Sequence, residues 1–131
     1  MVRRSDACPF ARRLGMRVTA IEGDRVRVSM PTAGGMENGH GTTHGGAIFA
    51  LADQAFGIAG NLSGGEDQIG LSAYIQYLSV PAGATLEAVA RKVSETEKTS
   101  LYAVEVYSGD RMVASFEGVG GFKIGVPAQK E

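Results

Sequence analysis

One segment of this chain has the length and periodicity of a helix, and it is apolar on nearly every side. Its only charged side chain is Asp53, which shares a stripe with Phe49 four residues before it and Phe56 three residues after it. A helix with so little polar surface must be covered by other protein. The segment spans residues 47–62, and its main apolar face consists of Ile48, Leu51, Ala52, Ala55, Ala59 and Leu62.

The rest of the chain is patterned mainly as strands. Polar and apolar side chains alternate in residues 25–30, after a hairpin turn at residues 22–24, and a short helix or turn is expected near residues 9–16. Short connections between the later segments predict antiparallel neighbours. We therefore predict one α+β domain, residues 1–131, in which a single antiparallel sheet curls around the helix. It would contain one strand before the helix and a meander of four after it, at residues 69–80, 85–94, 100–107 and 111–124.

Composition and charge argue against several classes of partner. The chain has 131 residues and a formal net charge of -1, without the clustered Lys and Arg that nucleic acid or an anionic membrane surface requires. Its longest apolar stretch is shorter than the ~18 residues of a spanning helix, and the N-terminal segment lacks the apolar core of a signal peptide. Cys8 is the only cysteine, so no intrachain disulfide can form. We expect a cytoplasmic protein that binds neither nucleic acid nor membranes.

The segment from Asn38 to Gly46 is rich in glycine and leads directly into the helix. The first N–H groups of a helix lack intrahelical acceptors and lie at the positive end of the helix dipole. Gly45 and Gly46 have no side chains, so a carbonyl group could approach their amides as an oxyanion hole requires. A plain turn that needs glycine for its backbone angles explains the same pattern.

Asp53 favours a catalytic site over a plain turn. A carboxylate on an apolar helix is costly to bury unless it is paired or functional, and apolar surroundings raise its pKa toward that of a general base. The structural alternative is a buried Asp that caps backbone amides of a neighbouring strand.

The spacing of these residues predicts an assembly. Eight residues at ~1.5 Å each separate Gly45 from Asp53 by about 12 Å along one helix, so a single carbonyl carbon cannot contact both. If a second copy packs its helix antiparallel across a two-fold axis, Gly45 of one subunit meets Asp53 of the other, and each dimer has two sites.

Glycines also occupy regular elements, where they lower stability. Gly57 and Gly60 each cost up to ~1 kcal/mol inside a helix, which a flat surface for close helix packing would explain. The alternative is that they contact the chain's own sheet. Gly118, Gly120 and Gly121 in the last strand predict a bulge or a close approach of another part of the chain.

The run His44–Asp53, HGGAIFALAD, followed by Ala55, Phe56 and Asn61, resembles the signature of hotdog-fold acyl-CoA thioesterases. The phenylacetate-degradation thioesterases are the most similar group. The likeness covers the element order of nearly the whole chain and is specific from Asn38 to Asn61. It implies a sheet wrapped around one helix, an active site across a subunit interface, and homodimers that pair into tetramers.

The resemblance also implies a role for each site residue. The Gly45 amide polarises the thioester carbonyl, Asp53 of the adjacent subunit is the nucleophile or general base, and Asn38 orients the carbonyl or the attacking water. The substrate is an acyl-CoA with an aryl or medium-chain acyl group, hydrolysed without metal or bound cofactor. Three further residues are expected to contact substrate or water: His44 as a loop-holding or thiol-side hydrogen-bonding group, Gly46 beside the oxyanion, and Ser72, a hydroxyl that positions water.

Other interpretations remain open at this point. Gln54 departs from relatives that place a small hydroxyl after the acid, which leaves the shape of the acyl pocket undetermined. A non-catalytic acyl-CoA sensor and a hydratase or dehydratase share the fold, but the Asp-x-Asn-Pro-x-His run of the hydratases does not occur. A metal site at His40, His44 and Asp53 would lack rigid geometry. Candidate contacts to CoA phosphates are Arg91, Lys92, Lys98, Arg111 and Lys123, although scattered surface charge explains each as well.

Overall fold

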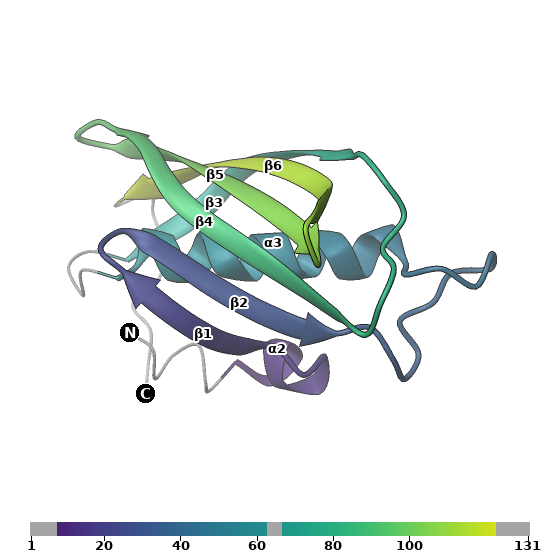
Figure 1. Ribbon diagram of the computed structural model, residues 1–131. Coiled ribbons are helices and arrows are strands. Elements are labelled where there is room, and N and C mark those ends of the chain that lie inside the picture. Colours follow the sequence, from purple (N-terminus) through teal and green to yellow (C-terminus); the bar gives the residue numbers. More distant parts are fainter. Residues whose placement is uncertain (1–7, 63–66, 123–131) are drawn as a thin grey trace.

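The computed structural model describes residues 8–62 and 67–122, in which a six-stranded antiparallel sheet curves around one long helix (Figure 1). The strand order across the sheet is β1-β2-β4-β5-β6-β3. The predicted α+β class and hotdog fold are confirmed. The helices are α2 (Pro9–Arg13) and α3 (Gly45–Gly60), and the strands are β1 (Arg17–Glu22), β2 (Arg25–Pro31), β3 (Gln68–Tyr77), β4 (Thr85–Glu95), β5 (Thr99–Ser108) and β6 (Arg111–Phe122).

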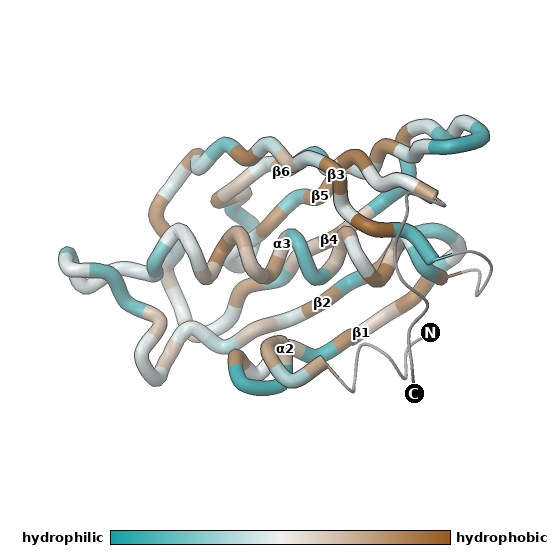
Figure 2. The backbone as a smooth tube through the Cα atoms, turned by 180° about the vertical axis from the view of Figure 1, so that it is seen from behind, coloured by the Kyte–Doolittle hydropathy of each residue, from teal (hydrophilic) through white to brown (hydrophobic). Residues whose placement is uncertain are grey.

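Helix α3 packs one face against the concave side of the sheet and forms the core with it. Phe116 of β6 lies at the centre, with its ring 5.5 Å from the ring of Phe49 and 5.9 Å from that of Phe56. The opposite side of α3 is not covered by any strand of the described chain (Figure 2). The predicted apolar face is confirmed, because the buried helix residues are Ile48, Leu51, Ala52, Ala55, Phe56, Ile58 and Ala59.

Two strands precede the helix, so the prediction of one is wrong. β1 pairs antiparallel with β2 through the predicted hairpin turn, where Gly23 has a φ of 64°. The pairing shifts register between Val18 and Ala20, which leaves Thr19 as a bulge. A bulge interrupts the alternation that identifies a strand in sequence, and neither face of β1 is fully buried. The sequence of β1 therefore lacks the pattern that makes β2 recognisable.

The predicted meander of four strands is correct only for β4, β5 and β6. β3 pairs with β6 instead of β4, and β4 takes the place beside β2. The connection at residues 78–84 passes the N-terminal end of α3 to reach the other half of the sheet (Figure 1). β3 is therefore an edge strand, and its outer backbone edge has no partner strand in the described chain.

The glycines of β6 make room for side chains from below the sheet. A Cβ on Gly118 would lie 2.9 Å from the ring of Phe56, and one on Gly120 would overlap the buried side chain of Gln68. The predicted close approach is thus confirmed, while the bulge in β6 lies at Val113 instead of at a glycine. Phe56 can reach the underside of the sheet because Gly118 lacks a side chain, and Gly120 makes room for Gln68 in the same way.

Candidate active site

The loop at residues 32–44 joins β2 to α3 and extends beyond the start of the helix (Figure 1). Its second half folds back as a small hairpin. The Asn38 N–H donates to the Thr42 carbonyl at 2.7 Å, and the His44 N–H donates to the Met36 carbonyl at 2.7 Å. These bonds fix the backbone that enters α3.

Asn38 holds this hairpin with its side chain. Its Oδ1 accepts hydrogen bonds from the N–H groups of His40 at 2.9 Å and Thr42 at 3.1 Å. Its Nδ2 donates to the Thr42 hydroxyl at 2.9 Å. The second Nδ2 hydrogen has no acceptor among the residues described, so it stays available for a substrate or water.

The start of α3 leaves one backbone donor unused. His44 is the N-cap, and its Nδ1 accepts a hydrogen bond from the Gly46 N–H at 2.8 Å. The His44 carbonyl accepts from the Ala47 N–H at 2.9 Å. Within residues 8–62 and 67–122, no acceptor is bonded to the Gly45 N–H. The two glycine amides therefore differ: the Gly46 N–H is occupied, and the Gly45 N–H is free to donate to a ligand.

Tyr77, at the end of β3, also contacts this helix start. Its hydroxyl donates to the Gly45 carbonyl at 3.1 Å, and a Cβ on Gly45 would lie 3.3 Å from the Tyr77 ring. Tyr77 could not be identified from the sequence, because it lies 32 positions from Gly45 and no local pattern relates the two residues.

Asp53 lies on the side of α3 that faces away from the sheet. It is exposed, so its expected position between two aromatic rings is wrong: Phe56 is buried and points into the core, where Phe49 also packs on Phe116. Asp53 has no hydrogen-bond or ion-pair partner in the part of the chain described, so it caps no neighbouring strand there. Partial burial still raises the pKa of its carboxyl above the ordinary value.

The exposed side of α3 is a nearly flat stripe around Asp53. Gly46 and Gly57 are exposed in the same row, with Ala50 half-buried between them. A Cβ on Gly57 would meet nothing within 4 Å, whereas one on Gly60 would overlap Gln68 of the chain's own sheet. Gly57 therefore leaves an open surface, and the alternative explanation is correct for Gly60.

Comparison with known proteins decides the family. The model of a family described as a domain of unknown function, DUF4442, matches residues 4–116. The acyl-coenzyme A thioesterase PaaI of Escherichia coli (strain K12) is 34% identical over 116 residues, covering 87% of this chain and 81% of that protein. The chain belongs to the PaaI family of acyl-CoA thioesterases. The resemblance to phenylacetate-degradation thioesterases is thereby confirmed.

Solved structures of PaaI proteins share this fold. A mutant of the phenylacetic acid degradation protein PaaI from Thermus thermophilus is 36% identical, with a TM-score of 0.81 over 87% of this chain and 98% of that one. The PaaI protein from the phenylacetic acid degradation operon of E. coli is 27% identical, with a TM-score of 0.81 over 92% of both chains.

The remaining predicted residues of this PaaI-family chain lie apart from the helix start. Ser72 is exposed on β3, directly after the bulge at Leu71, and pairs with Val119. Gln54 accepts a weak hydrogen bond from the Cys8 thiol at 3.9 Å. Lys92 forms an ion pair with Glu95 at 2.7 Å. Among the other basic candidates for CoA phosphates, Arg91 and Lys98 are exposed, Arg111 donates to the Val80 carbonyl at 2.7 Å, and Lys123 lies outside the described residues.

No metal or membrane element is found in the described part of this PaaI-family chain. Among residues 8–62 and 67–122, no group of three or more His, Cys, Asp or Glu side chains could hold a metal ion, so His40, His44 and Asp53 do not converge there. None of the helices in those ranges has the length and apolar character needed to cross a membrane.

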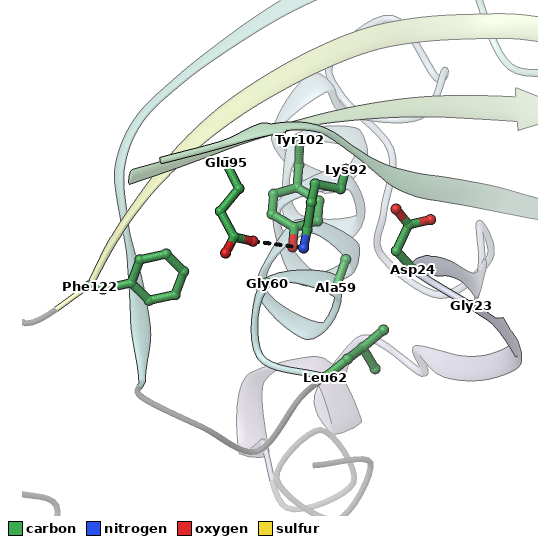
Figure 3. A pocket seen from close by; sticks show the side chains of 9 residues that line it. All are labelled: Gly23, Asp24, Ala59, Gly60, Leu62, Lys92, Glu95, Tyr102 and Phe122. Atoms are coloured by element: carbon green, nitrogen blue, oxygen red, sulfur yellow. Dashed lines mark ion pairs between the residues drawn. The ribbon is translucent and has the colours of Figure 1, made fainter. Parts of the chain in front are cut away.

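A cavity of about 440 Å³ lies at the opposite end of α3 from Gly45 (Figure 3). Two of the charged side chains in its wall, Lys92 and Glu95, form an ion pair with each other. The hydrogen bond from Lys92 to Glu95 raises the pKa of Lys92. None of the predicted catalytic residues lines this cavity. Its walls are formed by Gly23, Asp24, Ala59, Gly60, Leu62, Lys92, Glu95, Tyr102 and Phe122.

Proposed function

We propose that this PaaI-family chain hydrolyses an acyl-CoA thioester to a free acid and CoA at a site formed by two subunits. The Gly45 N–H of one subunit polarises the thioester carbonyl, and Asp53 of the other acts as general base or nucleophile. One observation carries the proposal: the free Gly45 N–H and the unpartnered, exposed Asp53 lie on one helix, two turns apart. Neither group has a partner within residues 8–62 and 67–122, and together they supply the oxyanion donor and the base or nucleophile that thioester hydrolysis needs.

The surface of the chain supports a second copy beside α3. Asp53 lies in an exposed stripe that includes Gly46 and Gly57, and open space above Gly57 would admit another helix closely. Antiparallel packing along this stripe brings Gly45 of each helix toward Asp53 of the other, which the ~12 Å separation within one helix requires. Contact with a second helix would also bury Asp53 further and raise its pKa more.

The edge strand β3 supports the same arrangement. An unpaired edge with exposed apolar side chains is a template for pairing with another chain. Antiparallel pairing of two β3 edges would join the sheets and place the two α3 helices side by side. We propose this homodimer, and a dimer of such dimers by analogy with the family. The exposed apolar residues on β3 and just beyond it are Leu71, Tyr74, Tyr77, Leu78 and Val80.

The proposed reaction needs only proton transfer and charge stabilisation. In the general-base route, Asp53 removes a proton from water as the water oxygen attacks the carbonyl carbon, and the Gly45 N–H stabilises the resulting oxyanion. The C–S bond then breaks, its electron pair stays on sulfur, and the proton returns from Asp53 to the CoA thiolate. In the nucleophilic route, the Asp53 carboxylate attacks the carbonyl carbon, the C–S bond breaks, and CoA leaves as the thiolate. Water then hydrolyses the mixed anhydride to the free acid and protonated Asp53, which passes its proton to the thiolate.

The other site residues have supporting roles in this proposal. Asn38 shapes the loop and offers its free Nδ2 hydrogen to the carbonyl or water. With its Nδ1 occupied by the Gly46 N–H, His44 presents Nε2 as a donor toward the sulfur. Ser72, on the exposed β3 edge, is proposed to position water. The lone thiol of Cys8 supports a cytoplasmic enzyme.

A thiol-release assay tests the activity directly. Purified protein is expected to release free CoA from aryl-acetyl or medium-chain acyl-CoA esters, with phenylacetyl-CoA and octanoyl-CoA as the first members of a panel. EDTA should leave the rate unchanged. Saturable binding of these esters without release of thiol would point to an acyl-CoA sensor, and loss of activity with EDTA would point to a metal enzyme.

Subunit complementation tests the shared site. Asp53→Asn and Gly45→Pro chains, each carrying a different affinity tag, are co-expressed and the heterodimer is purified through both tags. One of its two sites combines both defects and the other has neither, so about half of the wild-type turnover per dimer is expected. If one chain supplied both groups, the heterodimer would be as inactive as its parents.

A further inference from the structure

We infer that Tyr77 is a positioning residue that fixes the direction of the Gly45 N–H. This inference rests on the proposed role of that N–H in polarising the thioester carbonyl. Tyr77 ends the edge strand β3, and its hydroxyl reaches across to the first residue of α3, where it donates to the Gly45 carbonyl at 3.1 Å.

The two peptide groups on either side of the Gly45 Cα have four polar ends, and three of them are bonded. The His44 carbonyl accepts from the Ala47 N–H, and the Gly46 N–H donates to His44 Nδ1. The Gly45 carbonyl accepts from Tyr77. Only the Gly45 N–H has no acceptor in the described ranges. The Gly45 N–H shares its peptide plane with the His44 carbonyl, whose hydrogen bonds hold that plane directly. The bonds of the next peptide, including the one from Tyr77, fix the other side of the Gly45 Cα, so the donor is restrained from both sides, as a preorganised oxyanion donor requires.

Tyr77 is the only one of these partners that comes from outside the helix start. The contacts made by His44 are local, so they would follow the loop if it moved. Tyr77 is held by the sheet, because it pairs with Ala114 of β6 and the next N–H, that of Leu78, donates to the Val113 carbonyl at 2.8 Å. Its hydroxyl therefore ties the donor to the rigid part of the fold.

The Tyr77 ring also contacts Gly45, in addition to the hydrogen bond made by its hydroxyl. A Cβ on Gly45 would lie 3.3 Å from Cζ, 3.4 Å from Cε1 and 3.5 Å from the hydroxyl oxygen of Tyr77. The ring thus lies directly against the Gly45 backbone, with half of its side chain still exposed. A Cβ at residue 45 would crowd this ring, which would have to shift by a few tenths of an ångström.

Replacing Tyr77 with Phe tests the inference by removing one oxygen atom and keeping the ring. With phenylacetyl-CoA and octanoyl-CoA as probes, kcat is expected to fall by roughly 10-fold to 100-fold, because a displaced donor stabilises the transition state less. KM should change little, since the lost effect appears in the transition state. The matched control is Tyr107→Phe on β5, a strand inside the sheet, whose hydroxyl donates to the Glu105 carboxylate at 2.6 Å and whose loss should leave kcat unchanged.

A readout without turnover separates this inference from the proposed function. In ¹H–¹⁵N spectra of the substrate-free protein, Tyr77→Phe should shift the Gly45 and Gly46 amide resonances, and Tyr107→Phe should not. Unshifted amides, an unchanged kcat, or a raised KM with normal kcat would each overturn the positioning role. If the wild-type protein hydrolyses neither ester while the amides shift as expected, the proposed function fails and the contact itself stands.

Discussion

Replacing Asp53 with Asn is expected to lower kcat by about 100-fold or more while the protein folds and assembles normally. Asn has nearly the same shape as Asp but can neither accept the proton of water nor attack the thioester. The variant should be at least as stable as the wild type. The raised pKa shows that the folded chain disfavours the charged carboxylate, and this unfavourable effect is greatest above that pKa, where Asp53 is ionised.

Three measurements check this result. Turnover of an acyl-CoA ester gives kcat, thermal unfolding at neutral pH gives Tm, and sedimentation gives the oligomeric state. Asp110→Asn is the matched control, because Asp110 is an exposed carboxylate in the β5–β6 turn. Normal turnover in Asp53→Asn would remove Asp53 from the mechanism. A large loss of Tm together with activity would make Asp53 a structural residue.

The elements with strong periodicity could be predicted from the sequence. The apolar face of α3 and the alternation in β2 correspond to faces that are buried in the structure. The limits of α3 differ from the prediction, because the helix begins at Gly45, before the first apolar residue. Its start is set by the His44 cap, a side-chain contact that periodicity does not report.

The arrangement of the sheet was less predictable. Strands that follow one another in sequence usually pair when their connection is short, yet the connection at residues 78–84 leads from one edge of the sheet to β4 near its middle. What decides the order is packing around α3, with β2 and β4 on one side and β6 and β3 on the other. Information of this kind lies in contacts between distant residues and not in any local pattern.

The candidate site, too, could be predicted from the sequence only in part. Helix geometry alone separates Gly45 from Asp53, so the prediction that a second chain completes the site follows from the sequence. The surroundings of Asp53 could not be predicted from helix geometry. Asp53 and Phe56 are three residues apart, but this spacing does not show which of them faces the sheet. Gly57 and Gly60 illustrate this limit: both are helix glycines three residues apart, but one faces open space and the other Gln68.

Replacing Gly45 with Pro removes the amide hydrogen that has no acceptor among the described residues at the start of α3. We expect kcat to fall by about 100-fold to 1000-fold, the usual effect of losing an oxyanion-hole donor. The backbone can accept proline here. Gly45 is the first residue of α3, where proline is favoured, and the preceding His44 is extended, with φ -64° and ψ 135°, as proline requires of its neighbour. The fold and the dimer should therefore persist, which circular dichroism and sedimentation would verify.

Gly45→Ala is the control that isolates the amide hydrogen. Alanine retains the N–H but adds the same Cβ as proline, so both variants crowd the Tyr77 ring at about 3.3 Å. Any loss caused by the Cβ is common to both, so the ratio of their kcat values reports the replacement of the N–H hydrogen by the proline ring. We expect the Gly45→Ala variant to keep most of the kcat that the proline variant loses, since its N–H still points at the reaction centre. Equal activity of the two variants would mean that the free N–H at the helix start does not stabilise the oxyanion, and Asp53 would then act on a carbonyl polarised by another group.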